Sequence, residues 1–475
     1  LNRSGYPRII PRYHRKVLMS KDPRRDMICK MYLSLFSVNK IILLAPRITK
    51  KTFASIITPL TDTVENTLSE FVSNELRPRV RDLLLRYIPR LKSIPLVQGM
   101  SWMPSWSVLP TYGSWGLRHI PKEDRPPKSP YLYLPLELKV FGSLLRFTHL
   151  KGEQYSPLCL WASFTRYGMD IKGNNWITNR SLDMCESTWA PHAPNCGENP
   201  GFFSFGRLGQ SVEGRAKRRI FAMGNYLCQR LLKPFHEWLM KLLSMLPMDG
   251  TFDQPAPLRR LVGERHIHSF DLSAATDRFP LRVIFHVIEG MLGTVTASAV
   301  VNATLASHVF DVPFVKSKKG PPRTVSFIVG QALGFHGSWP SFALAHHLIV
   351  WCAAERVYPN KVFTRYAILG DDVIIADDCV ATEYSAIMAS MGVEISAVKS
   401  LISCSGAGEF AKRFMVNDMS VDVSPLSVKV VLSCYHPFGI YALGMMQPDL
   451  PLNVALRLSG CGFRTRSKPL HLLGI

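Results

Sequence analysis

The sequence predicts an α+β fold, in which an antiparallel sheet is backed by helices. Residues 366–376 form an apolar run, a tight Gly-Asp-Asp turn and a second apolar run, a pattern typical of a buried β-hairpin. A short strand-like run ends at Asp271. Apolar residues recur at helical spacing through residues 52–92, which predicts helices there. Long helical segments and short paired strands therefore coexist in one chain.

The composition points to a polyanionic partner. The chain has 475 residues, 47% of them hydrophobic, so it can bury a large core and is not a disordered protein. Its 57 Lys and Arg outnumber 35 Asp and Glu, for a net charge of +22. Such an excess is typical of proteins that bind nucleic acid or an anionic membrane surface, although a basic protein without such a partner has the same composition. No basic amphipathic helix stands out, which disfavours the membrane surface.

The ten cysteines contain no CxxC pair, so we interpret them as free thiols in a reducing compartment. Cys185, His192 and Cys196, joined by Cys159, are the nearest approach to a metal site, but their spacing matches no common zinc pattern. The uncharged run Gly290–Phe310 is rich in small and polar residues. We therefore expect a packed helix there and no integral membrane segment.

The N-terminal region is basic and the segment after the first helices is irregular. The first 50 residues hold twelve Lys and Arg against two Asp, which suggests an arm that grips phosphates; they resemble an organellar transit peptide only weakly. Residues 98–135 are rich in Trp and Pro. We expect irregular structure there and assign the segment no role.

A cluster of basic residues follows between Arg207 and Lys233. In an extended segment, Lys217 and Arg219 would project from the same face and could bind a triphosphate. Charge runs are also commonly just solvated surfaces. The basic cluster alone does not decide between these interpretations.

Three acidic positions carry the clearest chemical signal. The hairpin places Asp371 and Asp372 side by side at the rim of a buried sheet, and a site that keeps two adjacent carboxylates ionised usually contains a cation. The alternative is an ordinary turn that uses Gly and Asp for their backbone tolerance. Asp271 could reach the same cation if its strand pairs with the hairpin. Asp277, six residues on, would lie on the following turn, whereas a simple helix N-cap would account for Asp271 but not for the whole set.

A glycine-rich loop separates these acidic segments. Gly334, Gly337 and Ser338 are small enough for a bound strand to approach the backbone, and a helix should then run through Phe342 and Leu348. His346 and His347 lie on this helix. Histidines at such positions are usually in the core or on the surface, and contact with nucleotide or template is the alternative.

The order of these segments resembles the palm of viral RNA-dependent RNA polymerases, and most closely that of mitoviruses. Supporting strings are Asp271 with Asp277, the Gly330–Ser338 loop, Gly370-Asp371-Asp372, Lys399 and Glu409–Phe414, together with Gly250–Gln254, Ile220–Met223 and Leu232–Phe235. The resemblance covers nearly the whole chain. Departures are Gly337 where relatives tend to have serine, Ala216 where glycine is usual, and a region after Glu409 that is short for a full thumb.

The resemblance implies a right-hand polymerase fold with fingers, a palm with an antiparallel sheet, and a partial thumb. Residues 1–265 would form the N-terminal region and fingers, 266–415 the palm with the catalytic motifs, and 416–475 the partial thumb. The enzyme would transfer nucleotides from NTPs to an RNA 3′-hydroxyl under template direction, replicating a positive-strand RNA genome in the mitochondrion. Its partners would be RNA template, RNA product and NTPs, with no DNA; the sequence does not specify an oligomeric state.

The resemblance also assigns roles to individual residues. Asp271, Asp371 and Asp372 would hold two Mg²⁺ ions, or Mn²⁺ in their place, about 3.5–4 Å apart. Lys399 would be catalytic by protonating the leaving pyrophosphate. The nucleotide-binding residues would be Lys217 and Arg219 at the triphosphate, and Asp277 with Ser338 at the ribose 2′-hydroxyl.

Two alternatives remain open at the level of sequence. The short C-terminus is compatible with an inactive, truncated RNA-binding protein derived from a polymerase, such as a copy integrated into a plant genome, but the intact carboxylates argue against it. A reverse transcriptase shares the palm and the metal chemistry. It would more often have an aromatic residue at position 277 and a different residue before the paired aspartates, so it ranks lower.

Overall fold

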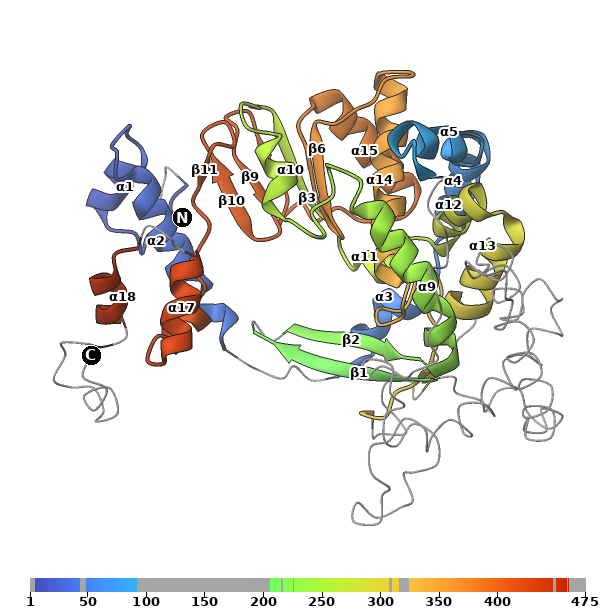
Figure 1. Cartoon of the computed structure of the whole chain (residues 1–475), viewed down its shortest axis with the longest axis horizontal. Coiled ribbons are helices and arrows are strands. Elements are labelled where there is room, and N and C mark those ends of the chain that lie inside the picture. Colours follow the sequence, from blue (N-terminus) through green and yellow to red (C-terminus); the bar gives the residue numbers. More distant parts are fainter. Residues whose placement is uncertain are drawn as a thin grey trace, which may run out of the picture.

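The computed structural model confirms an α+β fold (Figure 1). It describes residues 5–42, 48–91, 206–214, 217–224, 226–306, 310–315, 324–446, 450–458 and 460. The Trp- and Pro-rich segment and the Cys159, Cys185, His192 and Cys196 group lie outside the described residues.

A four-stranded antiparallel sheet forms the centre of the fold. Its strands are β6 (Tyr366–Leu369), β7 (Asp372–Ile375), β3 (Ile267–Asp271) and β8 (Leu401–Ser403), in the order β6-β7-β3-β8. Almost every side chain of β6 and β7 is buried, which explains why both strands are continuous apolar runs. The predicted hairpin and the predicted strand before Asp271 are therefore confirmed.

Helices cover this sheet and share one core with it. The central helix α14 (Ser338–Val357) is buried on all sides over most of its length, and packs against α15 (Asp378–Ser390) and α9 (Tyr226–Leu243). Helix α12 (Leu281–Leu292) packs against α14 and against α5 (Arg77–Tyr87). The apolar residues of all these helices belong to a single buried cluster.

The helices predicted within residues 52–92 are confirmed. They are α3 (Ala54–Ile57), α4 (Asp62–Phe71), the π-helical turn η3 (Val72–Leu76) and α5. Their buried residues recur every three or four positions, so one face of each helix joins the core. This N-terminal segment therefore packs in the same core as the central sheet.

A second sheet lies away from the first. The long ribbon of β1 (Gly206–Glu213) and β2 (Lys217–Met223) is extended by β4 (Phe310–Asp311) and β5 (Thr324–Val325), in the order β2-β1-β4-β5. In Figure 1 this ribbon lies below the central sheet, and α9 runs from one to the other. The extended conformation predicted for Lys217 and Arg219 is confirmed.

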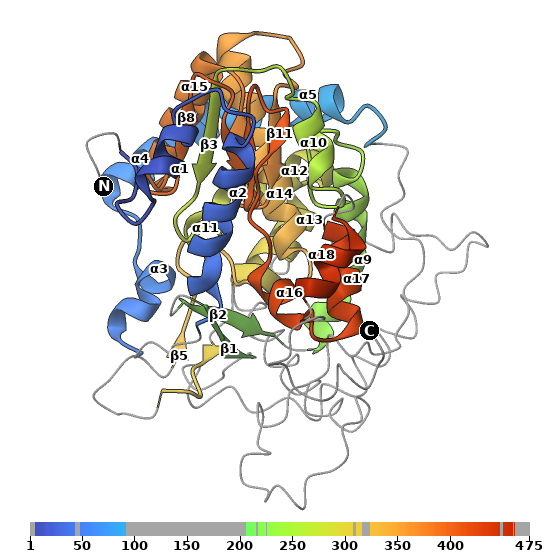
Figure 2. The ribbon, with the colours of Figure 1, turned by 90° about the vertical axis from the view of Figure 1, so that its left-hand side faces the viewer.

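The C-terminal part forms a small sheet and three helices. The sheet contains β9 (Gly408–Phe410), β10 (Arg413–Val416) and β11 (Val421–Asp422), and the helices are α16 (Val428–Ser433), α17 (Pro437–Met446) and α18 (Leu452–Leu458). The N-terminal helices α1 (Arg12–Leu18) and α2 (Arg25–Phe36) lie on the same side of the molecule (Figures 1 and 2). Ser34 of α2 accepts a hydrogen bond from the Leu426 amide at 2.9 Å, so α2 contacts the segment that precedes α16.

The remaining elements are short, and one of them corrects a prediction. They comprise the 3-10 turns η1 (Ser37–Lys40) and η2 (Lys50–Phe53), α10 (Pro255–Arg259), α11 (Ala275–Arg278), α13 (Thr294–Val300) and the π-helical η10 (Val301–Ala306). The single packed helix predicted for Gly290–Phe310 was wrong, because Gly293 adopts a φ of 84° and separates α12 from α13. A positive φ is readily available to glycine and ends the helix there. Within the described ranges, no helix is both long and apolar enough to cross a membrane.

Two glycines in helices offer a matched test of core packing. A Cβ on Gly290 of α12 would lie 2.4 Å from Val80 Cγ1 of α5, whereas a Cβ on Gly444 of α17 meets nothing within 4 Å. We expect Gly290→Ala to lower the free energy of unfolding by about 1–2 kcal/mol through overpacking. Gly444→Ala should raise it by up to about 1 kcal/mol through helix propensity. Urea denaturation of both variants measures the difference, and equal effects would contradict the close approach of α5 and α12.

Candidate active site

The three predicted carboxylates come together at one end of the central sheet. Strand β3 ends at Asp271 and β7 begins at Asp372, and the two residues are direct partners in the antiparallel ladder. Asp371 precedes β7 in the turn, next to Gly370, whose φ of 62° lies in the left-handed region that glycine adopts most readily. Asp371 is exposed and Asp372 is partly buried. The site thus presents two carboxylates on neighbouring strands and a third at the hairpin tip.

The electrostatics of this site show that the carboxyl groups are crowded. Burial, the largest cause, and repulsion from Asp371, Asp271 and Glu409 together raise the pKa of Asp372 to about 7. Lys412 partly offsets these effects. A cation placed among these groups would relieve the repulsion.

Lys399 lies beside the Asp271 carboxylate. Its Nζ is 2.8 Å from Asp271 Oδ1, and both side chains remain partly accessible to solvent. The preceding backbone is fixed by the Ser396 amide, which donates to the Asp271 carbonyl at 2.9 Å. The segment that carries Lys399 is therefore attached to the end of β3.

The donor chemistry of the site fits a divalent cation. Asp271, Asp371 and Asp372 supply hard carboxylate oxygens, which Mg²⁺ and Mn²⁺ prefer. The raised pKa of Asp372 reflects its burial and the neighbouring carboxylates, which the positive charge of Lys412 offsets only in part. The carboxylate of Asp271 is instead paired with Lys399. Among the residues that the structure describes, no three His, Cys, Asp or Glu side chains are arranged to hold a metal ion.

Asp277 lies in α11, a one-turn helix that follows β3. Its carboxylate accepts a hydrogen bond from Ser55 Oγ of α3 at 2.7 Å, and burial raises its pKa. The neighbouring Arg278 donates to the Thr58 carbonyl. The N-terminal segment thus holds the position predicted to face the ribose; the sequence offered no signal for Ser55.

The glycine-rich loop packs against protein segments on both sides. Gly330 is so close to α11 that an added Cβ would lie 2.2 Å from the Thr276 carbonyl oxygen, and one on Gly334 would lie 2.2 Å from that of Ala222 in β2. Ser338 is buried, and its hydroxyl donates to the Ala332 carbonyl at 3.0 Å. Ser338 and Asp277 share no hydrogen bond in the described structure. While its proton is directed to Ala332, the Ser338 hydroxyl could offer a ribose only its oxygen, as an acceptor.

The basic residues of β2 lie on the exposed side of the ribbon. Lys217 and Arg219 are both exposed and two positions apart in the strand, so they share one face. Arg219 Nε is 2.7 Å from Glu213 Oε1. An incoming phosphate would therefore compete with this carboxylate for Arg219.

The histidines of α14 are core residues. His346 and His347 are both fully buried. His346 contacts the Gly370 carbonyl and the Tyr384 hydroxyl, whereas His347 contacts the Tyr366 hydroxyl and Asp249. The core interpretation of these two side chains is confirmed.

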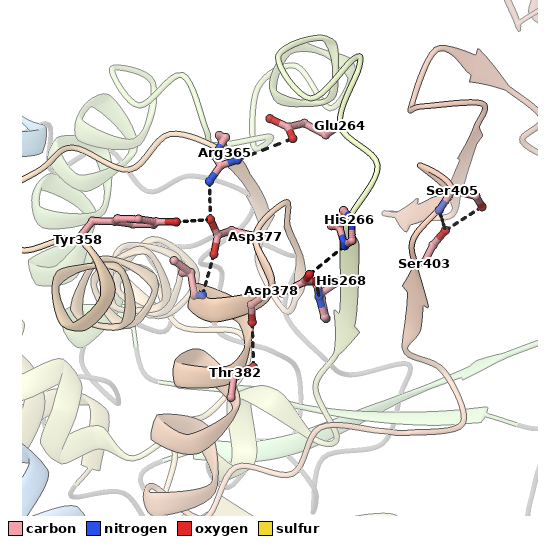
Figure 3. Close-up of polar contacts among 11 residues, drawn as sticks. Glu264, His266, His268, Tyr358, Arg365, Asp377, Asp378, Thr382, Ser403 and Ser405 are labelled. Carbon is pink, nitrogen blue, oxygen red and sulfur yellow. Dashed lines mark hydrogen bonds and ion pairs between the residues drawn. The ribbon is translucent and has the colours of Figure 1, made fainter.

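A second polar cluster lies at the other end of β7, and the sequence gave no clear signal for it. Asp377 caps α15 by accepting from the Val380 amide at 3.0 Å and also binds Tyr358 and Arg365 (Figure 3). Asp378 accepts from both His266 and His268. A cavity of about 440 Å³ is lined by five residues of this cluster, His266, Tyr358, Arg365, Asp377 and Asp378. They tie the start of β3 to the start of α15, at the end of the sheet opposite to Asp271.

A family model and several known proteins are similar in sequence to this chain. The family model described as mitovirus RNA-dependent RNA polymerase matches residues 148–445, which is more than half of the chain. Two uncharacterized mitochondrial proteins of Arabidopsis thaliana are similar: one is 45% identical over 47% of this chain and 90% of its own length, the other 53% identical over 33% and 76%.

A viral protein and a solved structure complete the comparison. The RNA-directed RNA polymerase of Cryphonectria parasitica mitovirus 1 is 34% identical over 44% of this chain, but the match covers only 25% of the viral protein. The crystal structure of the RNA-dependent RNA polymerase of a human picobirnavirus is 16% identical, with a TM-score of 0.37 over 46% of this chain and 44% of that one; this likeness is too distant to bear on function.

The chain therefore belongs to the mitovirus RNA-dependent RNA polymerase family. Its enzyme class is RNA-directed RNA polymerase, a nucleotidyltransferase.

The raised pKa of Asp372 predicts a pH-dependent cost to stability. Between about pH 4 and pH 7 the folded protein binds a proton on Asp372 that the unfolded chain releases, so this group makes wild-type stability fall as the pH rises through that window. In metal-free buffer, Asp372→Asn should be more stable than wild type by on the order of 1–3 kcal/mol at pH 8, with the gain absent near pH 4. Urea denaturation at both pH values measures it.

Asp378→Asn is the matched control, because the His268 and His266 contacts lower the pKa of Asp378. That variant should show no gain as the pH rises. Parallel stability curves for wild type and Asp372→Asn would contradict the crowding of the carboxylates.

Proposed function

We propose that the chain catalyses template-directed RNA synthesis, in which the 3′-hydroxyl of a growing RNA attacks the α-phosphate of an NTP and pyrophosphate leaves. The observation that carries the proposal is the pairing of Asp271 with Asp372 at the end of the central sheet, with Asp371 at the adjoining hairpin tip. Membership of the polymerase family supports the same reaction.

Asp271, Asp371 and Asp372 are the residues that would hold the divalent cations, Mg²⁺ or Mn²⁺. When bound, two such ions supply the positive charge that acidifies the attacking hydroxyl and neutralises the phosphate oxygens. The protein contributes the rigid placement of these carboxylates, since catalysis of phosphoryl transfer is mainly positioning and electrostatic stabilisation. The ladder fixes two of them, and the Gly370 turn carries the third.

The flanking side chains bind the rest of the substrate. Lys399, whose Nζ lies 2.8 Å from Asp271 Oδ1, protonates the leaving pyrophosphate. Lys217 and Arg219 bind the triphosphate from the exposed face of β2. Asp277 accepts a hydrogen bond from the ribose 2′-hydroxyl, and the Ser338 hydroxyl assists.

The proposed polymerase function also assigns the regions of the chain, its partners and its location. Residues 1–265 are the N-terminal region and fingers, 266–415 the palm and 416–475 the partial thumb. RNA template, RNA product and NTPs are the partners, and the net charge of +22 supports binding along RNA phosphates. The similar Arabidopsis proteins are named as mitochondrial, which supports replication of a positive-strand RNA in the mitochondrion.

Removal of one hairpin carboxylate tests the reaction. Wild type should incorporate labelled NTP into RNA only with a template and Mg²⁺, and Asp371→Ala should lose roughly 10³-fold or more of that activity, because a group that places the reacting charges is missing. Asp378→Ala, an exposed change at the opposite end of the sheet, should retain it. RNA binding without extension by wild type would instead support a non-catalytic RNA-binding protein.

Asp277 provides a separate test of sugar selection. Asp277→Ala should reduce the preference for NTP over dNTP by roughly 10-fold or more, because the 2′-hydroxyl loses its acceptor. The ratio of kcat/KM for the two substrates measures it. Unchanged discrimination would remove Asp277 from this role, and a strong preference of wild type for dNTP would indicate a reverse transcriptase.

A further inference from the structure

The β-ladder does not orient Asp371. Leu369 and Asp372 are the last partners of the β6–β7 ladder, so Gly370 and Asp371 form the turn and have no ladder partners. The direction of the Asp371 side chain therefore depends on the plane of the Gly370–Asp371 peptide. A group that binds the carbonyl of this peptide therefore restricts that direction.

His346 of α14 binds this carbonyl. Its Nδ1 lies 2.7 Å from the Gly370 carbonyl oxygen, and both groups are buried. A carbonyl oxygen can only accept a hydrogen bond, so Nδ1 must carry the proton. The bond joins the central helix α14 directly to the peptide that precedes Asp371.

Tyr384 of α15 completes the arrangement. Its hydroxyl lies 2.8 Å from His346 Nε2. Burial lowers the pKa of His346 to about 4, so the ring is neutral, and with the proton on Nδ1 its Nε2 must accept from this hydroxyl. The Tyr384 ring also stacks on Phe270 with centroids 5.6 Å apart. One tyrosine thus fixes the tautomer of His346 and contacts the residue before Asp271.

Trp339 packs against the turn and restricts its movement. A Cβ built on Gly370 would lie 2.1 Å from the Trp339 ring, so the turn rests on this indole and cannot move toward α14. The neighbouring His347 has no such connection, because it bonds to Tyr366 and Asp249. The two adjacent histidines therefore serve different parts of the core.

We propose that His346 is a positioning residue for Asp371, with Tyr384 holding it in the tautomer that donates to Gly370; the inference rests on the proposed polymerase function. His346 touches neither substrate nor metal. Through its bond to the turn, it sets where the Asp371 carboxylate stands relative to Asp271 and Asp372.

Two substitutions at one position separate positioning from packing. Asn can place an amide N–H near the position of Nδ1, whereas Gln places it near Nε2. His346→Gln should lower kcat roughly 10- to 100-fold with an unchanged KM for NTP, since small displacements of a reacting group have effects of this size. His346→Asn should lose distinctly less. Equal losses in the two variants, or a change in KM instead of kcat, would overturn the proposal.

Tyrosine variants give the matched control. Tyr384→Phe keeps the ring on Phe270 but removes the hydroxyl, and should lower kcat. Tyr366→Phe removes an equally buried hydroxyl that bonds to His347 and Trp351, and should lower the melting temperature without lowering kcat. If both variants lower kcat to the same extent, loss of general stability explains the effect and the proposal fails.

Two measurements do not require turnover. Imidazole ¹⁵N NMR, with His346→Asn for assignment, should show the proton on Nδ1 in wild type and its transfer toward Nε2 in Tyr384→Phe. Mn²⁺ alone, titrated by electron paramagnetic resonance, should bind His346→Gln roughly tenfold more weakly than wild type, as for other residues behind metal ligands. If the wild type binds Mn²⁺ but extends no RNA, only the proposed polymerase function is contradicted. Equal Mn²⁺ affinities, or a wild-type proton on Nε2, would overturn the role of His346.

Discussion

The pairing of Asp271 with Asp372 across β3 and β7 is the constraint on which the rest of the site depends. A slip of one residue would turn one of the two side chains to the other face of the sheet. The register is held by buried neighbours, since Phe270 pairs with Val373 and both are in the core. The Asp377 and Asp378 contacts secure the opposite end of the same strands. This register places carboxylates close enough to repel one another. The repulsion and the burial of Asp372 disfavour its ionised form, which raises its pKa.

Helix α14 fixes the position of the paired strands and of the hairpin turn. It is buried along most of its length and carries two histidines whose ring nitrogens all have partners. Buried polar groups of this kind are costly unless they are satisfied, so each histidine ties α14 to specific neighbours. One connects it to the hairpin turn and α15, and the other to β6 and to Asp249. The sheet, the turn and two helices therefore move together.

The side of the site that would face the nucleotide depends on segments distant in sequence. Ser55 and Asp277 are 222 positions apart but share a hydrogen bond of 2.7 Å. The Ile328 amide donates to the Ile56 carbonyl at 3.1 Å, and the Gly330 amide donates to the Asp277 carbonyl at 3.0 Å. Helix α3, α11 and the glycine-rich loop thus form one connected group. This explains why the helical segment of residues 52–92 belongs to the same core as the sheet.

The sequence by itself determined the local features of this protein. Alternation of apolar runs with Gly-Asp-Asp predicted the β6–β7 hairpin, helical spacing predicted α4 and α5, and the order of acidic segments predicted the family. These signals are local, because backbone conformation and side-chain periodicity depend on near neighbours. The helix break at Gly293 escaped prediction, since a single glycine inside an uncharged run is compatible with either outcome.

Only the tertiary structure decided which side chains meet. The contacts of Lys399 with Asp271, Ser55 with Asp277 and His346 with Gly370 each join residues far apart in the chain. A local sequence pattern does not distinguish the two adjacent histidines, yet His346 contacts the Gly370–Asp371 turn and His347 contacts Tyr366 and Asp249. Their roles differ because packing places each ring opposite a different partner, and that placement is a property of the whole core rather than of any segment.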